Sequence, residues 1–159
     1  MTYAAKTEVP VERSRGEIER TLARYGATAF GYAWGADRAV ITFDASDRRV
    51  RFAIALPARN ERRFTHFTRG GGGSQYARTA AAAEEQWQQA CRVRWRALAL
   101  VVKAKLEAVE AGISEFETEF LAHIVLPSGE TAGDWMRPQI AYAYRSGEMP
   151  PLLAVGPAS

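Results

Sequence analysis

Few side chains in this sequence could do covalent or metal chemistry. There is one cysteine, Cys91, and there are two histidines, His66 and His123. No two of these residues have a metal-ligand spacing such as CxxC or HExxH. Cys91 stands four residues from both Trp87 and Trp95, which on a helix places it on an apolar stripe and predicts a packed, unreactive thiol. A nucleophile made of Cys91 and a distant histidine is the formal alternative. We therefore expect no enzyme, no metal and no cofactor.

Residues 48–69 combine positive charge with aromatic rings, since they carry seven Arg against one Glu. Guanidinium groups pair with phosphates and release counterions, and aromatic rings stack on unpaired bases. The segment therefore predicts a site for single-stranded nucleic acid, with single-stranded DNA favoured. An Arg-rich loop that is only solvated is the alternative. The expected contacts, including a basic strip on the following helix, are Arg49, Arg51, Arg59, Arg62, Arg63, Phe64, Phe67, Arg69, Arg92, Arg96 and Lys103.

The charge is divided along the chain. Residues 48–105 carry 13 basic and 3 acidic groups, whereas residues 106–159 carry 2 basic and 8 acidic groups. Such separation is typical of a polyanion-binding surface. Neutralisation of the two blocks within the fold, or across an oligomer contact, is the alternative. The 18 Arg against 3 Lys also reflect GC-rich codons.

The elements that must position these side chains form one domain of the α+β class. Period-2 alternation predicts a three-stranded antiparallel meander over 27–34, 39–45 and 50–56. Its bulky face, which includes Phe30, Tyr32 and Trp34, must be covered by helices, while the other face has small residues and Arg at its edge. Apolar stripes predict helices over 11–25, 76–111, 114–126 and 132–147, with an extended tail over 148–159.

The long helix 76–111 has more apolar surface than packing against a sheet would cover. Its main stripe runs from Trp87 to Val109. A second stripe, which we expect beside the first, contains Val93, Ala97, Val101, Ala104 and Ala108. So wide an apolar arc predicts contact with a second helix or a second subunit, and hence a homo-oligomer.

Residues 57–75 are expected to be a flexible loop, with Gly70–Gly73 as a hinge or tether. The glycine run lacks the GxxxxGK[ST] pattern of a phosphate loop. The five residues GGGGS are also those of the usual engineered linker. The order helix, three strands, helix occurs in double-stranded RNA-binding domains, but there the last helix begins with a basic cluster. Here it begins "QYARTAAAAEEQ", so we give that order little weight.

Residues 94–153 and 9–30, "VPVERSRGEIERTLARYGATAF", resemble a group of small uncharacterised proteins of bacteriophages and prophages from GC-rich bacteria. The resemblance covers most of the chain apart from 57–85. It implies a bacterial host cytoplasm and a phage-related role such as DNA recombination or replication, and it carries over no catalytic residue.

Two function classes follow. The first is the nucleic-acid-binding protein described above. The second is a phage-encoded protein-interaction module that inhibits a host or defence factor, with the acidic tail and "EMPPLL" as its contact surface. No apolar run reaches the length of a membrane span and no signal peptide is recognisable, so we expect no membrane partner and a cytoplasmic location.

Overall fold

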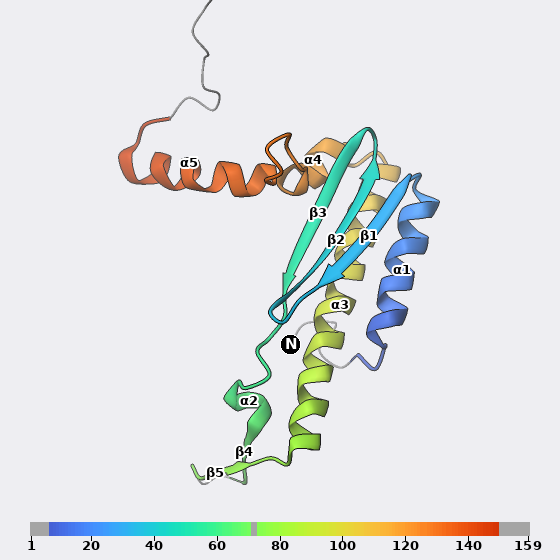
Figure 1. The fold of residues 1–159 in the computed structure, drawn as a ribbon. Coiled ribbons are helices and arrows are strands. Elements are labelled where there is room, and N and C mark those ends of the chain that lie inside the picture. Colours follow the sequence, from blue (N-terminus) through green and yellow to red (C-terminus); the bar gives the residue numbers. More distant parts are fainter. Residues whose placement is uncertain (1–6, 71–72, 150–159) are drawn as a thin grey trace, which may run out of the picture.

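A computed structural model describes residues 7–70 and 73–149 of the chain (Figure 1). The expected α+β class is confirmed. A three-stranded sheet and a long helix form the body, and a small second sheet lies near the start of the long helix. The elements are α1 (Val11–Arg24), β1 (Ala29–Trp34), β2 (Arg38–Ala45), β3 (Arg48–Ala55), α2 (Arg62–Thr65), β4 (His66–Thr68), β5 (Gln75–Ala77), α3 (Ala80–Glu110), α4 (Phe116–Phe120), the 3-10 helix η1 (Leu121–His123) and α5 (Ala132–Ser146).

The main sheet is the predicted antiparallel meander, in the order β1-β2-β3. Its register pairs Tyr32 with Ile41 and Ile41 with Phe52, so the bulky residues of all three strands share one face. Between β2 and β3 the chain reverses through Ser46 and Asp47, which both have positive φ, as a tight two-residue hairpin turn requires. Alternation alone was therefore enough to predict this sheet.

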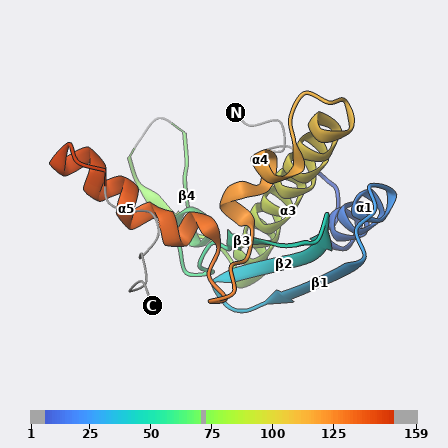
Figure 2. The same cartoon turned by 90° about the horizontal axis from the view of Figure 1, so that it is seen from above.

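The bulky face of the sheet is covered by α1 and α3, which lie on the same side of it (Figure 2). α4 closes one end of this core with Phe120, a fully buried ring. The Phe120 ring meets those of Phe43 and Phe52 edge-on, with centroids 5.8 and 6.3 Å apart. Burial of these rings and of the apolar side chains around them stabilises the fold.

The ends of the two long helices follow from local chemistry. α3 begins after Thr79, whose hydroxyl accepts a hydrogen bond from the Ala82 amide at 3.2 Å. α1 ends before Gly26, which has a φ of 84°. The two helices are joined on their polar flanks, where the Arg96 guanidinium donates to the Glu17 carboxylate at 2.5 Å.

Two aromatic residues that we expected under the helices are exposed. Tyr32 and Trp34 have 44% and 68% of their surface accessible, because β1 is an edge strand and the helices cover the centre of the sheet more fully. Their rings stack on each other with centroids 5.7 Å apart. The Arg15 guanidinium lies 4.3 Å from the centroid of Tyr32.

We expected a flexible loop over 57–75, but this segment is not loop throughout. This segment contains α2 and β4, and its last residue begins β5. The predicted helix over 114–126 was too long, since helical structure ends at His123. Ile124 then forms an isolated antiparallel bridge with Val50, and the Val125 amide donates to the Arg49 carbonyl at 2.8 Å. Free backbone groups on the edge of β3 thus pair with Ile124 and Val125, two β-branched residues that the sequence pattern assigned to a helix.

The second apolar stripe of α3 faces away from the sheet, and not beside the main stripe as we expected. Ala97 follows the buried Trp95 by two residues, which is about 200° around a helix. Val101, in the middle of the stripe, is exposed. Ala104 is exposed as well, whereas Val93, Ala97 and Ala108 are half-buried, so the described residues cover the stripe only in part.

α5 projects from one end of the sheet (Figures 1 and 2), and none of its residues is buried. Of the predicted tail 148–159, only Glu148 and Met149 are described, and 150–159 lie outside the described residues. Across 7–70 and 73–149, no helix has the length and apolar character that crossing a membrane requires.

Replacing Phe120 with Ala should lower the free energy of unfolding by about 3–5 kcal/mol, because it empties a site between β2, β3 and α3. Urea unfolding followed by circular dichroism measures this. The matched control is Ile113→Ala, which removes an exposed apolar side chain and should change the free energy by less than about 0.5 kcal/mol. Equal effects of the two changes would contradict the core described here.

Candidate nucleic-acid interface

The hairpin unit, residues 62–78, consists of α2, β4, β5 and Arg78, and lies beside the first turns of α3 (Figure 1). β4 and β5 pair antiparallel, with Phe67 opposite Tyr76. The Arg78 amide extends this pairing by donating to the Thr65 carbonyl at 2.7 Å. At the entrance to the unit, the Trp87 indole N–H donates to the Pro57 carbonyl at 2.7 Å. The first two contacts close the unit on itself, and the Trp87 indole holds the segment before it against α3.

The glycine run joins β4 to β5. Gly70 has a φ of 32°, and the run continues through Gly73 to the start of β5. Since both flanking strands pair with each other, the glycines connect a hairpin. They do not tether two halves of the fold, as we expected. Glycine suits such a connection because it adopts positive φ at little cost.

Phe64 is not placed to stack on bases, which corrects its predicted role. It is only 4% exposed and packs where α2 meets α3. The Arg63 guanidinium covers its ring at 4.5 Å from the centroid. Phe64 is therefore the apolar anchor of the hairpin unit, because one turn of helix has too few backbone hydrogen bonds to stay folded by itself.

An exposed aromatic pair stands on the two strands of the hairpin unit. The Phe67 and Tyr76 rings have centroids 5.9 Å apart and are tilted by 36°. They are 37% and 47% exposed. The Arg78 guanidinium lies 5.3 Å from the Phe67 centroid. A pair of accessible rings beside a cation is the arrangement that stacks on unpaired bases.

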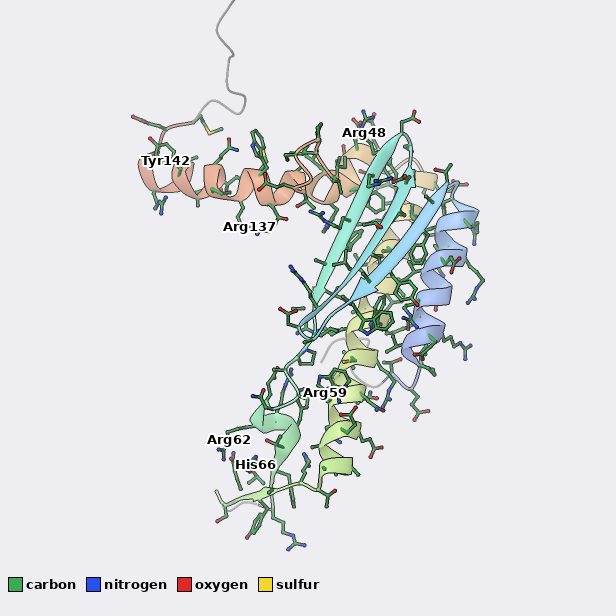
Figure 3. The ribbon with its side chains drawn as sticks, viewed as in Figure 1. Arg48, Arg59, Arg62, His66, Arg137 and Tyr142 are labelled. Atoms are coloured by element: carbon green, nitrogen blue, oxygen red, sulfur yellow. The ribbon has the colours of Figure 1, made fainter. Side chains whose placement is uncertain are left out.

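The arginines of this region differ in what they contact. Arg62 donates to the side-chain oxygen of Gln75 at 2.6 and 3.1 Å, and since that partner is a neutral amide the positive charge is not cancelled (Figure 3). Arg69 is exposed. In contrast, Arg63 pairs with Glu61 at 2.6 Å. An arginine already paired with a carboxylate has less to gain from a phosphate.

Arg59 is also neutralised, and it is held from two sides. Its guanidinium pairs with the Glu84 carboxylate and lies 3.6 Å from the centroid of the Trp87 ring. The hydrogen bond from Arg59 lowers the pKa of Glu84, so that carboxylate keeps its charge. Arg59 is thus a structural link between the segment before α2 and the start of α3.

The predicted residues on the main sheet lie away from the hairpin unit. Arg49 donates to both carboxylate oxygens of Asp44 at 2.8 Å, which lowers the pKa of Asp44. Arg51 is half-buried on the open face of the sheet. Arg48, which precedes Arg49 in β3, shows this separation. Figure 3 places it at the end of the molecule opposite Arg62 of the hairpin unit.

The predicted residues on α3 form a third group. Arg96 pairs with Glu17 of α1, and Arg92 donates to Gln89 at 2.8 Å. Lys103 is exposed further along the helix. The single basic surface that we expected is therefore divided among the hairpin unit, the open face of the sheet and the flank of α3.

Tyr76 and Arg78 were missed because residues 76–79 were assigned to the long helix. A signal for them was present in "QYAR", where Tyr76 and Arg78 alternate as they would on a strand. The cross-strand partner that makes Tyr76 part of a stacking surface depends on the register of the hairpin. That register could not be read from a short run of alternating residues.

Two of the three side chains considered for covalent or metal chemistry, Cys91 and His123, are packed against other side chains. Cys91 is buried, and burial raises the pKa of its thiol, which favours the unreactive form. His123 stacks on Phe52 with centroids 3.9 Å apart. Within the described ranges, no three His, Cys, Asp or Glu side chains come together as a metal site would require.

Comparisons with known proteins gave no match: no family model, curated protein or solved structure is similar to this chain.

His123 should make stability depend on pH. Burial lowers its pKa from the ordinary value of 6.5. Below about pH 6.5 the histidine therefore binds a proton more readily in the unfolded chain than in the folded chain. The free energy of unfolding should therefore fall as the pH drops from 7 to 5. His123→Phe keeps a ring on Phe52 and should reduce this fall in urea unfolding at the two pH values. Equal falls in both proteins would show that other groups cause it.

Proposed function

We propose that this protein is a non-enzymatic binder of single-stranded nucleic acid, and that the hairpin unit is its contact surface. The observation that carries the proposal is the exposed Phe67–Tyr76 pair with the Arg78 guanidinium 5.3 Å from the Phe67 centroid. Among the described residues, no carboxylate pairs with Arg78 or with the other two arginines of the unit, Arg62 and Arg69. In this proposal the two rings stack on bases, and Arg62, Arg69 and Arg78 contact phosphates. Stacking on every base is possible because every base has a π-face, so binding would be tolerant of sequence.

The distribution of paired and unpaired arginines favours the hairpin unit as the contact surface over the larger basic surface that the sequence predicted. Each phosphate contact on a single strand contributes about 0.7 to the slope of log affinity against log salt concentration. Three arginines should therefore give a slope of about −2. The paired Arg49, Arg59 and Arg63 should add little to it.

Single-stranded DNA is favoured over double-stranded RNA. The order α1, β1, β2, β3, α3 is that of double-stranded RNA-binding domains, which use basic residues at the start of the last helix. The first turns of α3 instead carry Glu84 and Glu85. The resemblance to phage and prophage proteins supports a role in DNA recombination or replication in a bacterial cytoplasm. The partly exposed apolar stripe on α3 supports self-association, which would bring several hairpin units onto one strand.

Tyr76→Ala should weaken the binding of a labelled dT oligonucleotide by about tenfold, because one stacked ring is lost. Arg69→Ala should weaken binding and reduce the salt slope by about 0.7. Fluorescence anisotropy at several salt concentrations measures both quantities.

The matched controls are Tyr144→Ala and Arg145→Ala, which make the same chemical changes on exposed positions of α5. They should leave affinity and salt slope unchanged. If the α5 variants and the hairpin variants lose affinity equally, or if the natural chain does not bind at low salt, the proposal is wrong.

A second candidate function, a protein-interaction module that blocks a host or defence factor, is favoured by an apolar groove. The groove lies between η1, the turn 126–130 and α5, and has a volume of about 1120 Å³. Leu121 and Ile140 line it and are exposed. Gly133 lets α5 pack closely on Ala122 of η1, since a side chain at position 133 would approach the Ala122 carbonyl to 2.7 Å. Such a groove suits an apolar segment of another protein.

This candidate predicts a partner that depends on the groove. Tagged natural protein should capture from a bacterial lysate a protein that the double variant Leu121→Asp and Ile140→Asp does not capture. Arg69→Ala should still capture it, because Arg69 lies on the hairpin unit. Capture of the same proteins by all three would speak against the groove.

A further inference from the structure

A cavity of about 660 Å³ lies where the start of α1 meets the first half of α3 and the ends of β1 and β3. Its size is within the range of small-molecule sites. It is separate from the hairpin unit, because none of the described residues 62–70 and 73–78 lines it. Its lining includes four charged and three aromatic side chains: Glu8, Glu12, Arg15, Arg92, Trp34, Trp87 and Trp95.

Three of the four tryptophans in the chain line this cavity. Trp34 comes from the end of β1, and Trp87 and Trp95 stand two turns apart on α3. Trp95 is buried, whereas Trp34 is mostly exposed. An exposed indole on an edge strand loses contact with water when a flat ligand covers it, which favours binding. The cavity thus offers aromatic walls at its base and at its opening.

Four charged side chains line the cavity, and their charges cancel. Glu8 and Glu12 are acidic, and Arg15 and Arg92 are basic. The contact between Arg15 and Glu12 is loose, at 3.8 Å, and Arg92 donates to a neutral amide. Both hydrogen-bond donors and acceptors therefore remain for a ligand.

These features exclude two classes of ligand that aromatic pockets often take. A quaternary or methylated ammonium needs open ring faces without cations, but Arg15 lies 5.9 Å from the centroid of Trp34 and 5.8 Å from that of Trp95. A fatty chain would cover these four charged groups without offering them any further hydrogen bond, which is costly. A flat, uncharged ring with donors and acceptors on its edge satisfies both the walls and the polar groups.

We propose that this cavity binds a nucleobase, stacked on Trp34 and hydrogen-bonded at its edge by Arg15, Arg92 and the two glutamates. The base belongs either to a free nucleotide or to a nucleic-acid strand. The assignment goes beyond the hairpin unit and stands if strand binding there fails.

The test uses the full chain with adenosine 5′-monophosphate and with a dA oligonucleotide as probes. Either probe should shift the indole N–H signals of Trp34, Trp87 and Trp95 in nitrogen–proton correlation spectra, while that of Trp135 on α5 stays in place. Trp34→Ala changes an exposed residue and should weaken binding by about tenfold. The matched control Trp135→Phe should bind as the natural chain does.

The variant Phe67→Ala with Tyr76→Ala separates the two proposals, because it should lose stacking at the hairpin unit and still show the shifts at the cavity. Saturable shifts with the monophosphate identify a free-nucleotide site, and shifts with the oligonucleotide alone identify a base within a strand. Absence of indole shifts with both probes, or equal shifts with ribose 5-phosphate, which has no base, would overturn the inference.

Discussion

The packing of α3 against one face of a three-stranded sheet is the contact on which the rest of the molecule depends. α3 has 31 residues and is about 46 Å long, whereas the longest strands have 8 residues and span about 27 Å. Because the sheet holds only part of the helix, the remaining turns extend past it. Those turns carry the hairpin unit and one wall of the tryptophan-lined cavity.

This overhang explains how a few residues can form ordered structure outside the main core. α2 is a single turn and β4 and β5 have three residues each, so none would be stable alone. Phe64 provides the apolar contact with α3, and Arg59 bridges the approach to the unit by contacting both Glu84 and Trp87. A segment rich in arginine and glycine is thus held in one place, and its exposed rings are presented on a fixed surface.

The arginines show how much about a binding site the amino-acid composition alone can indicate. Their number and clustering were visible in the sequence, and they indicated a polyanion site. The folded chain places a carboxylate beside Arg49, Arg59 and Arg63, whose partners are between 2 and 25 positions away. The charge that stays accessible on the hairpin unit is therefore much smaller than the charge of the segment. Of what remains, the Arg78 guanidinium lies beside the Phe67–Tyr76 pair.

The sequence by itself determined the fold class, the three strands and the long helix, because period 2 and period 3.6 repeat over enough residues to be unambiguous. It also determined that Cys91 is a packed thiol. Only the tertiary structure decided that Phe64 is buried, that Tyr76 joins Phe67, and that Trp34 opens onto a cavity. These outcomes depend on strand pairing over a few residues and on which helix face covers an edge strand. Both are contacts between distant segments, and a local pattern carries too little information to predict them.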